Sequence, residues 1–568
     1  TYWPPHARQG MPGFDQVLHA VSDAWQNQHD KIAEQAARLT ASLAIDRTPA
    51  SETLDPLAIL EAAAAALERA YDATHGGFGG PPKFPHPLEI RLCLRLARWH
   101  GRENLMHMAL HSLDQMAAGG VYDQLGGGFH RYAVDAHWLV PHFEKMLYDN
   151  ALLAGCYLEA FLATGQDRYR EIVIETLDYT LREMQHPDGG FYSTQDADSE
   201  GVEGKFFVWS LEEINETLDK DSADLVCAFY NVTAAGNFEG QNILHQSHSL
   251  ETFAAAQGRD LAECKQQLNR ARQTLFALRQ QRICPGLDDK MLADWNGLLI
   301  DALARAGAVL DMPRYLEAAR RASDMIDTKM RDTAGRLMHS WREGVAEGMA
   351  FVDDYAALLG AWITLYECTF EEAWIERARG LAETLQQRYE DPRQGGFFFT
   401  ADDHERLIVR RKELFDQATP NGNALAAEGL LRLADLLGRD DFRQSAQRAI
   451  EVAGDTIRQA PLAQGQSVLA LMRQVTAVRQ WVMVGSEPSP ETKEVMHGLR
   501  QAYLPDHVLA CRLGDSTSAA SAALDHLFSD RPAGATPWEL HYCEGSTCLP
   551  PANTLAAAKT LITKAAET

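Results

Sequence analysis

The sequence predicts a mainly α fold, an (α/α)6 barrel in which a ring of six inner helices is enclosed by a ring of six outer helices. Two observations lead to this prediction. Apolar residues recur at helical spacing over most of the 568 residues, and the helices that they define are of two alternating kinds. The connections between these helices also alternate, between short and long. A small C-terminal α/β appendix and an N-terminal helix complete the predicted architecture.

The two kinds of helix differ in how much of their surface is polar. The amphipathic helices, with charged outer faces, are expected at 52–73, 103–118, 167–186, 312–329, 370–390 and 440–458. The helices that are apolar almost all round are expected at 87–98, 143–163, 294–308, 353–368, 421–437 and 463–474. A helix without a polar face is usually buried on all sides. Regular alternation of the two kinds along the chain therefore indicates a closed double ring.

The connections support the same arrangement. Only a few residues, such as 163–167, join an apolar helix to the next amphipathic one. In the other direction the loops are long and contain Gly-Gly-Phe runs, within 76–80, 126–130, 189–192 and 395–398. This recurrence is typical of a degenerate internal repeat. The long loops all leave the same helix ends, so they gather on one face, and function commonly lies on loops that a rigid scaffold presents.

Segments outside the ring are also expected. Residues 1–50 are predicted to form an N-terminal extension with one long helix at roughly 14–44. The barrel is predicted over 51–478, with an insertion at about 187–293 that holds a hairpin and helices.

The C-terminal region, 479–568, changes in character. Residues 480–485 and 507–512 have the pattern of strands, with a helix between them and another after Pro551. This pattern predicts a small α/β region. The Cys543-Glu-Gly-Ser-Thr-Cys548 segment lacks the Cys-x-x-Cys spacing of dithiol oxidoreductases, so we expect a structural pair or plain packing rather than a redox role.

Composition excludes several classes of partner. The formal net charge of −26 repels polyanions, so we expect neither nucleic acid nor an anionic membrane surface as a partner. No stretch approaches the roughly 18 consecutive apolar residues of a membrane span. Nine scattered cysteines indicate a reducing, cytoplasmic compartment. No phosphate-binding glycine fingerprint follows a strand, and no cofactor is expected.

Polar residues stand at the starts of the apolar helices, which converge on the mouth of a central cavity. Asp and Asn are favoured helix caps, and capping alone explains one such residue per helix. Several starts carry two polar groups, however, and aromatic residues stand beside three of them. Aromatic rings stack on sugars, and carboxylates and amides bind hydroxyl groups. The expected sugar-binding residues are His86, Arg131, Tyr148, Asp149, Asp198, Lys290, Asp294, Trp295, Asn296, Asp353, Tyr355, Lys412, Asn421 and Asn423.

Histidines and carboxylates of the same loops are candidates for proton transfer, because a histidine titrates near neutral pH. We favour His142 as the base. A helix that begins near Pro141 would align His142, Lys145 and Asp149 on one face. The alternative for each histidine is a hydrogen-bonded structural role. The candidate catalytic residues are His142, His130, Glu144, Asp196, Asp354 and Asp416.

No metal site is expected from the sequence. The His and Cys spacings do not match a structural zinc site, and His142-x-Glu144 is not a protease zinc helix. The loop from Asp196 to Gly201 resembles the first half of a calcium loop, but Phe207 stands where the closing glutamate belongs. Loop carboxylates that serve a substrate, or simple turn chemistry, explain this loop better.

Four long motifs, at 119–132, 138–150, 288–296 and 543–548, resemble thioredoxin-domain-containing proteins of the spermatogenesis-associated type. The resemblance covers essentially the whole chain. It implies a thioredoxin-like module ahead of a six-hairpin barrel that is similar to N-acylglucosamine 2-epimerases and related glycosidases. Residues 1–50 are then expected to be the remnant of that module, and the module itself is a candidate partner.

Three functions are consistent with these features. The first is a sugar epimerase or isomerase that works by histidine and carboxylate acid–base chemistry on a small-molecule sugar. The second is a glycoside hydrolase, which needs two carboxylates across the scissile bond. The third is a non-catalytic binding or scaffolding barrel that acts with the thioredoxin-like module. The sequence does not separate the first two, because both use the same residue types and differ in side-chain distances.

Overall fold

The computed structural model describes residues 3–8, 10–43, 54–514, 522–529, 531 and 536–567. Six inner helices form a closed ring, in which each packs against the next. In order around the ring they are α3 (Pro87–His100), α5 (Leu147–Thr164), α11 (Ala293–Val309), α13 (Val352–Thr369), α15 (Gly422–Leu437) and α17 (Gly465–Val475), and α17 packs against α3. Each inner helix is buried over much of its length because it has neighbours on several sides.

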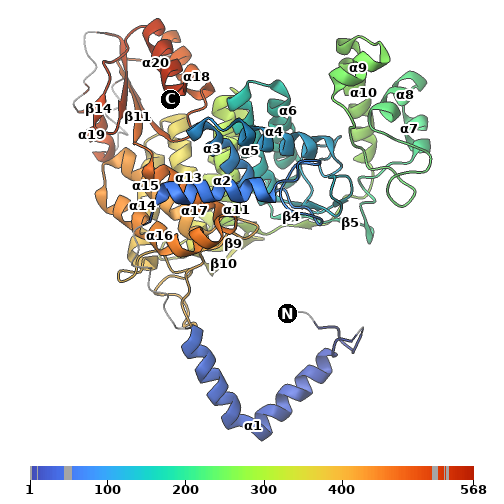
Figure 1. The fold of residues 1–568 in the computed structure, drawn as a ribbon, viewed down its shortest axis with the longest axis horizontal. Coiled ribbons are helices and arrows are strands. Elements are labelled where there is room, and N and C mark those ends of the chain that lie inside the picture. Colours follow the sequence, from blue (N-terminus) through green and yellow to red (C-terminus); the bar gives the residue numbers. More distant parts are fainter. Residues whose placement is uncertain are drawn as a thin grey trace.

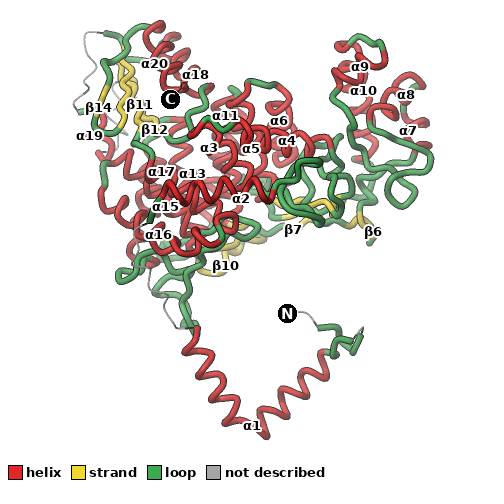
Figure 2. Tube along the Cα trace, in the orientation of Figure 1, coloured by secondary structure: helices red, strands yellow, loops and turns green. Residues whose placement is uncertain are grey.

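Six amphipathic helices form the outer ring, and each packs against the inner ring. They are α2 (Pro56–Ala70), α4 (Glu103–Ala118), α6 (Asp167–Tyr179), α12 (Pro313–Lys329), α14 (Ala373–Thr384) and α16 (Asp440–Gln459). α6 and α14 each continue into one π-helical turn, at Thr180–Met184 and Leu385–Tyr389. The predicted (α/α)6 barrel is confirmed, with mostly helical structure in two layers (Figure 2).

One predicted helix start is wrong. The second inner helix begins at Leu147, because the residues before it pair with neighbouring loops as the short strands β2 (Pro141–His142) and β3 (Lys145–Met146). β2 pairs with β1 (Tyr132–Ala133), and β3 pairs with β4 (Thr194–Gln195). His142, Lys145 and Asp149 therefore do not share a helix face.

The Gly-Gly-Phe loops are closed by the same asparagine contact in three repeats. An asparagine in the first turn of the next inner helix accepts a hydrogen bond from the phenylalanine N–H and donates one to the phenylalanine carbonyl. The pairs are Asn150 with Phe129, Asn296 with Phe191 and Asn423 with Phe397. We call this contact the asparagine clamp. It satisfies loop backbone groups that are buried against the ring.

A buried ion pair also recurs at these loops. The aspartate that opens the turn accepts a hydrogen bond from a lysine ahead of the next inner helix, at 2.7–2.9 Å. The pairs are Asp72 with Lys83, Asp123 with Lys145 and Asp391 with Lys412. Together with the clamps, these pairs confirm the predicted internal repeat at the level of side-chain contacts.

The third connection carries a lobe with its own apolar core, drawn in green in Figure 1. Its helices are α7 (Leu211–Thr217), α8 (Lys220–Phe229), α9 (Leu250–Gln257) and α10 (Leu261–Arg279). The short hairpin of β5 (Asp198–Ser199) and β6 (Val202–Glu203) precedes them. At the return to the ring, β7 (Leu287–Asp288) pairs with β4. Arg279 fastens the lobe to the barrel through two 2.8 Å hydrogen bonds to Asp123.

A three-stranded sheet lies on the loop face beside α11 and α13. Its order is β10 (Val345–Met349), β9 (Met338–Arg342) and β8 (Met291–Leu292), all antiparallel. β8 leads directly into α11, and the β9–β10 hairpin leads into α13. The hairpin therefore places its side chains beside the first turns of two inner helices.

The C-terminal region forms a four-stranded sheet with helices. The strand order is β12-β11-β13-β14. β11 (Arg479–Gly485) and β12 (His507–Leu513) are the two predicted strands, and they run parallel, with α18 (Pro490–Gln501) between them in the chain. The sequence analysis missed β13 (Trp538–Glu544), which runs antiparallel to β11, and the short β14 (Thr547–Cys548). The predicted last helix is α20 (Leu555–Glu567).

This C-terminal region covers the end of the barrel opposite the long loops. The Tyr503 hydroxyl donates to Glu159 of α5 at 3.1 Å, and Arg95 of α3 donates to the carbonyl of Pro505 at 3.2 Å. Arg98 of α3 donates to the carbonyl of Ala566 at the end of α20. The inner ring is thus open at its loop face and covered at its base.

The predicted N-terminal helix is α1 (Phe14–Leu43), which has no buried residue along its described length. The backbone of Gln28 is not helical, and the two halves of α1 meet there at an angle. α1 extends away from the barrel in Figures 1 and 2.

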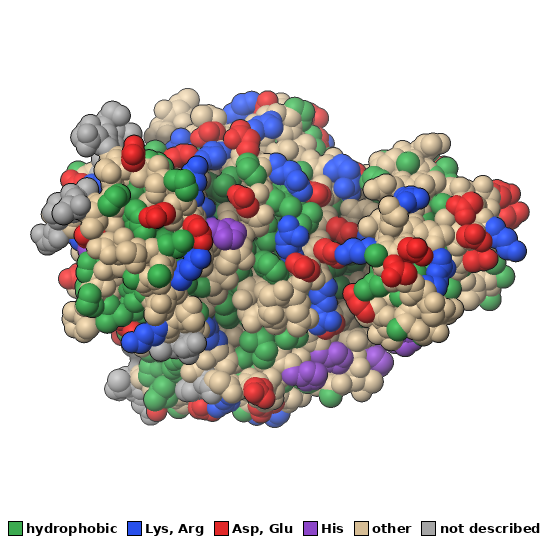
Figure 3. All heavy atoms as spheres, turned by 90° about the horizontal axis from the view of Figure 1, so that it is seen from above, with side chains coloured by type: hydrophobic (Ala, Val, Ile, Leu, Met, Phe, Trp, Pro, Cys, Tyr) green, Lys and Arg blue, Asp and Glu red, His purple; other side chains and the backbone are tan. Residues whose placement is uncertain are grey.

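The excess of acidic residues is spread over the molecule. On the face drawn in Figure 3, acidic and basic side chains are interspersed rather than separated by sign. Among the described helices, none combines the length and the apolarity that crossing a bilayer requires.

Candidate active site

A cavity of about 90 Å³ lies on the axis of the inner ring, and all six inner helices line it. The lining includes Ala151, Leu298, Ala357 and Leu425. Residues three or four positions apart lie on one face of a helix. Four predicted site residues stand one turn before these lining residues and therefore share their faces at the mouth of the cavity: Tyr148, Asp294, Asp353 and Asn421.

A cluster at this mouth joins α11, α13 and the β9–β10 hairpin. His339 Nδ1 lies 3.0 Å from both carboxylate oxygens of Asp354, which is fully buried. Asp354 also accepts hydrogen bonds from the N–H groups of Asp294 and Phe351. One ring nitrogen of His339 and one oxygen from each of Asp294 and Asp354 lie within 4.8 Å of one another. We call these three residues the mouth cluster.

Burial and mutual repulsion shift the titration of this region. Burial raises the pKa of Asp294 well above its usual range, and the charge of Asp354 adds to the effect. Burial and the Asp354 charge also raise the pKa of Asp353, to about 7. Burial lowers the pKa of His339, but hydrogen bonding and charge from Asp354 outweigh it, so the net shift is upward. Oδ1 of Asp294 and Oδ1 of Asp353 have no hydrogen-bond partner among the described residues. The mouth therefore holds proton donors near neutral pH.

His339 is a residue that the sequence analysis missed. The histidines among the predicted site residues lie in the loops before α3 and α5, whereas His339 lies in the connection before α13. The signal was present, since His339 lies in the loop that leads into the Asp353–Asp354 helix start.

Asp416 lies where the first turns of α15 and α17 meet. Its carboxylate accepts from the Asn421 N–H and side chain at 2.9 and 2.8 Å, and from the Gln466 N–H at 3.0 Å. Burial raises its pKa to about 6 in spite of these hydrogen bonds. Asp353 approaches the same helix start from the α13 side, because a Cβ on Gly422 would lie 2.0 Å from its Oδ1. Two carboxylates with raised pKa values thus flank the start of α15.

A second polar group lies on the α5 side of the mouth. Arg131 donates to Glu144 at 2.9 Å, and the rings of Tyr148 and Trp295 meet edge to face at 4.7 Å. The Tyr148–Trp295 contact joins this group to the start of α11. Asp149 is buried, and burial raises its pKa well above the usual range.

His142 lies outside the mouth cluster. Its Nδ1 is 2.6 Å from Glu203 of the β5–β6 hairpin, its Nε2 is 3.6 Å from Glu144, and its ring stacks on Tyr132. His142 is partly exposed. The structure removes the helix alignment on which its predicted role as the base depended.

His130 is only 2% exposed, and Phe143 and Phe207 enclose its ring. Its Nδ1 is 2.8 Å from the carbonyl of Phe143. Burial, with the charge of Lys145 beside it, lowers its pKa to about 3. The imidazole therefore joins the loop around residue 130 to Phe143, and the role of His130 in proton transfer stays a prediction.

Four of the expected sugar-binding residues make contacts within the protein that stabilise the fold. Asn296 and Asn423 are asparagine clamps, and Lys412 is the lysine of a buried ion pair. Tyr355 is 2% exposed and packs against Tyr389, at the end of the π-helical turn after α14. Their polar groups hold loops to the ring, so their positions at helix starts have a structural cause.

Other expected residues also lie on the loop face. Asp196 and Asp198 are exposed near the base of the inserted lobe, and Lys290 is paired with Asp288 at 3.0 Å. His86 precedes α3 in a left-handed backbone conformation, and its Nδ1 is 3.0 Å from Glu89. Asn421 caps α15 through the Ala424 N–H.

A belt of charged residues, which the sequence analysis also missed, forms the floor of the cavity. Glu159 is fully buried and accepts hydrogen bonds from Arg91, Arg95 and Arg305 at 2.9–3.2 Å. The other members are Asp301, Glu367, Glu428 and Arg432. One charged residue in an apolar helix does not change its periodicity, so the belt is hard to see in the sequence. The available signal is that these charges recur on the helix faces that line the cavity. Below the belt lies a second cavity of about 150 Å³, which the C-terminal region closes.

The mouth cluster is also the set of described residues that could hold a metal ion, through two carboxylates and one imidazole. The donor set is a plausible one for a divalent ion. However, Asp354 already accepts hydrogen bonds on both oxygens, and His339 uses Nδ1 for that contact. The residues therefore satisfy one another as an acid–base cluster, and a metal would have to compete with these contacts.

Comparison with curated proteins gives close relatives. No protein-family model matches the chain. Spermatogenesis-associated protein 20 from Homo sapiens is 33% identical over 603 residues, which cover 97% of this chain and 75% of that protein. The protein of the same name from Mus musculus is 32% identical over 581 residues, which cover 94% and 73%.

Solved structures resemble the barrel at low sequence identity. The GH76 alpha-mannanase of Bacteroides thetaiotaomicron has a TM-score of 0.47 and 10% identity, over 73% of this chain and 95% of that one. Cellobiose 2-epimerase from Bacillus thermoamylovorans has a TM-score of 0.44 and 10% identity, over 69% and 85%. The structural neighbours include glycoside hydrolases and sugar epimerases, but at these scores they do not bear on the chemistry of this chain.

Proposed function

The chain belongs to the spermatogenesis-associated protein 20 family, and we propose that its barrel is a sugar epimerase or isomerase that works by acid–base catalysis. One observation carries the proposal. The mouth cluster brings an imidazole and a carboxyl group whose pKa burial raises within 4.8 Å of each other, on the cavity-facing side of α11. Such reactions need a base that removes a proton next to a carbonyl and an acid that protonates the oxygen.

In this mechanism His339 is the base. Asp354 holds Nδ1 at 3.0 Å, which fixes the ring and leaves Nε2 for the substrate. Nε2 takes the proton from the carbon next to the substrate carbonyl, and the electron pair of that C–H bond moves toward the carbonyl oxygen. Asp294 donates its proton to that oxygen and gives a neutral enediol. For an isomer, His339 returns its proton to the former carbonyl carbon while the Asp294 carboxylate takes the proton of the hydroxyl on the neighbouring carbon, which becomes the new carbonyl. For an epimer, the enediol turns its other face to His339, which reprotonates the same carbon, and Asp294 takes back the proton of the original carbonyl oxygen.

The charged belt supports a sugar as the ligand. Arg91 Nη2 lies 3.9 Å from Glu428 Oε1, and Arg305 Nη1 lies 3.9 Å from Asp301 Oδ2. Both distances exceed a direct hydrogen bond. A hydroxyl group donates and accepts at once, so it bridges such a donor and acceptor. Four of these groups in one cavity favour a ligand with several hydroxyls.

The test is incubation with a panel of mono- and disaccharides in deuterated water, read by NMR. We expect deuterium at the carbon next to the carbonyl and new anomeric signals. His339→Gln keeps a hydrogen-bonding group but carries no proton at neutral pH, so turnover should fall about 10²–10⁴-fold. The melting temperature should change little, because Asp354 keeps its two backbone donors.

His142→Gln is the matched control, since His142 also pairs with a carboxylate but lies outside the mouth cluster. It should retain turnover. Loss of activity in His142→Gln and not in His339→Gln would move the base to His142. Binding without turnover of any sugar would favour the non-catalytic barrel.

A second function, glycoside hydrolysis, is favoured by Asp353 and Asp416. A hydrolase needs a protonated carboxyl group as its acid and a second carboxylate as nucleophile or base. Asp353, with a pKa of about 7, fits the acid, and Asp416, with a pKa of about 6, fits the base. Release of a free sugar from a glycoside panel, abolished by Asp353→Asn and kept by His339→Gln, would select hydrolysis over isomerisation.

The thioredoxin-like partner and the cytoplasmic location stay predictions. A thioredoxin-like module supplied in trans should bind the barrel in a pull-down if it is a partner. Absence of binding by the full chain would remove that partner.

A further inference from the structure

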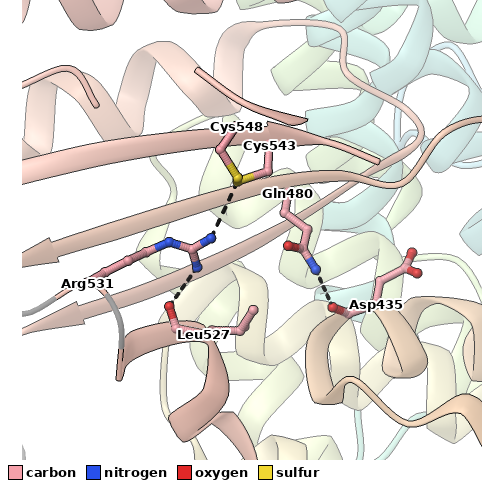
Figure 4. The surroundings of a disulfide bond; sticks show 6 residues. All are labelled: Asp435, Gln480, Leu527, Arg531, Cys543 and Cys548. Carbon is pink, nitrogen blue, oxygen red and sulfur yellow. Dashed lines mark hydrogen bonds between the residues drawn. A yellow bond between two sulfur atoms is a disulfide. The ribbon is translucent and has the colours of Figure 1, made fainter. Parts of the chain in front are cut away.

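The hairpin of β13 and β14 carries a disulfide bond that the proposed sugar chemistry does not use. Cys543 and Cys548 are directly opposite each other in the antiparallel pair and are joined as a disulfide (Figure 4). The two sulfur-bearing residues differ in burial, since Cys543 is 4% exposed and Cys548 is exposed. The other seven cysteines are free thiols.

A cation lies beside the buried half of this disulfide. The Arg531 guanidinium donates through Nη2 to Cys543 Sγ at 3.4 Å, and through Nη1 to the carbonyl of Leu527 at 2.7 Å. Figure 4 shows the guanidinium directed at the sulfur. A neighbouring guanidinium stabilises a thiolate relative to a thiol. Cys543 is therefore the better leaving group of the two, and Cys548 is the sulfur that a reagent can reach.

We propose that the Cys543–Cys548 disulfide is a thiol–disulfide exchange site that accepts electrons from a dithiol reductant. A thiolate of the reductant attacks the exposed Cys548 Sγ. The S–S bond breaks, a mixed disulfide forms at Cys548, and Cys543 leaves as a thiolate beside Arg531. The second thiol of the reductant then attacks its own sulfur in the mixed disulfide and releases Cys548 as a thiolate that takes up a proton. Two electrons pass from the dithiol to the protein, and the reductant leaves as its disulfide.

The surrounding structure lets this exchange change the C-terminal region. β14 has two residues and pairs with β13 only at Cys543–Cys548 and Glu544–Thr547. β14 leads to α20, whose end is held by Arg98 of the inner ring. Beyond β14, the Leu549 N–H still donates to the Tyr542 carbonyl, and Ala552 pairs with Leu540. Without the covalent link, β14 is joined to β13 by its two residue pairs alone in the described structure, and such a segment opens locally. Reduction should therefore loosen the hairpin and leave the rest of the sheet paired.

The experiment uses the full chain in a glutathione redox buffer, with alkylation and mass spectrometry of each cysteine. Cys543→Ser should accumulate a glutathione adduct at Cys548. Cys548→Ser is the matched variant, and its buried Cys543 should be modified at least about tenfold more slowly. The free and exposed Cys284 provides an internal reference for ordinary thiol reactivity.

The role of Arg531 is tested by the rate of reduction with dithiothreitol. Arg531→Gln should slow reduction about three- to tenfold, because the leaving thiolate loses its cation. Circular dichroism checks that this variant is folded. Adduct formation at Cys543 before Cys548, or reduction of the parent only after unfolding by urea, would overturn the proposal. Neither measurement depends on the sugar chemistry.

Discussion

The mouth and the floor of the central cavity are built on the same inner helices, yet their carboxyl groups are in opposite electrostatic environments. At the floor, Glu159 accepts hydrogen bonds from three arginines, and the charge of Arg95 above all lowers its pKa well below the usual range in spite of burial. At the mouth, Asp294 and Asp353 each leave one buried oxygen without a partner in the described structure, and their pKa values rise. Paired charge holds the ring together, whereas carboxyl groups without a partner in the described structure are available for proton exchange.

The largest expected effect is at the floor. Glu159→Gln keeps the volume of the side chain but leaves Arg91, Arg95 and Arg305 facing one another without their shared carboxylate. Removing one partner of a buried ionic network costs about 3–5 kcal/mol. The free energy of unfolding, measured in urea, should fall by that amount. Glu428→Gln is the control and should cost clearly less, because its nearest described arginine is 3.9 Å away. Equal losses of unfolding free energy in the two variants would mean that Glu159 is not the carboxylate on which the arginines of the floor depend.

A smaller effect of opposite sign is expected at the mouth. Asp353 titrates at about 7 in the folded protein and near 3.8 when its carboxyl group is unperturbed. The folded protein therefore holds this proton more tightly, and the free energy of unfolding falls as pH rises from about 4 to 7. Asp353→Asn removes that dependence. The variant should match the parent at pH 3.5 and be more stable by about 1–3 kcal/mol at pH 8.

Thermal melting at the two pH values tests this prediction. Asp196→Asn is the control, because Asp196 is exposed and its charge is solvated. It should leave the pH dependence of the parent intact. A destabilised Asp353→Asn at pH 8 would show that the ionised carboxylate stabilises the mouth, contrary to the comparison drawn with the floor.

The smallest expected effect is at the contact between floor and C-terminal region. Tyr503→Phe removes one hydrogen bond to Glu159 and leaves the arginine bonds in place. The expected loss is about 1–2 kcal/mol, since a hydrogen bond to a charged group contributes about that much. In a Glu159→Gln background the hydrogen bond from Tyr503 is neutral, so Tyr503→Phe should lower the unfolding free energy by less than in the parent. A double-mutant cycle measures the difference between the two losses.

The fold was predictable because its signals are local. Each inner helix is recognised by an apolar run and each outer helix by one charged face, so the ring follows from counting the two kinds. Asp294, Asp353 and Asp354 were found for a similar reason, since a helix start is visible in the sequence. The sequence of a helix start does not reveal where its side chains point. Asn296 and Asn423 look like ligand-binding amides but bind the backbone of the preceding loop.

The parts of the site that were missed depend on contacts between distant segments. His339 acquires its role only because the β9–β10 hairpin folds against the first turn of α13. Glu159 and Arg305 lie far apart in the chain, in helices whose periodicity is unaffected by one charge each. Cys543 and Cys548 were recognised as a possible pair, and the structure joins them, but the cation beside Cys543 comes from Arg531, ahead of β13.

The pairing of β4 with β7 has a consequence for how the inserted lobe relates to the ring. Gln195 stands opposite Leu287, and Thr194 opposite Asp288, so the chain leaves and re-enters the ring at neighbouring points. Phe191 and Asn296, which form a clamp, lie just outside this pair on either side. The inserted segment of some ninety residues therefore takes up no more space at the ring than a tight turn would. The ring therefore does not fix the length of the lobe, which can lengthen or shorten as long as a basic partner for Asp123, such as Arg279, is kept.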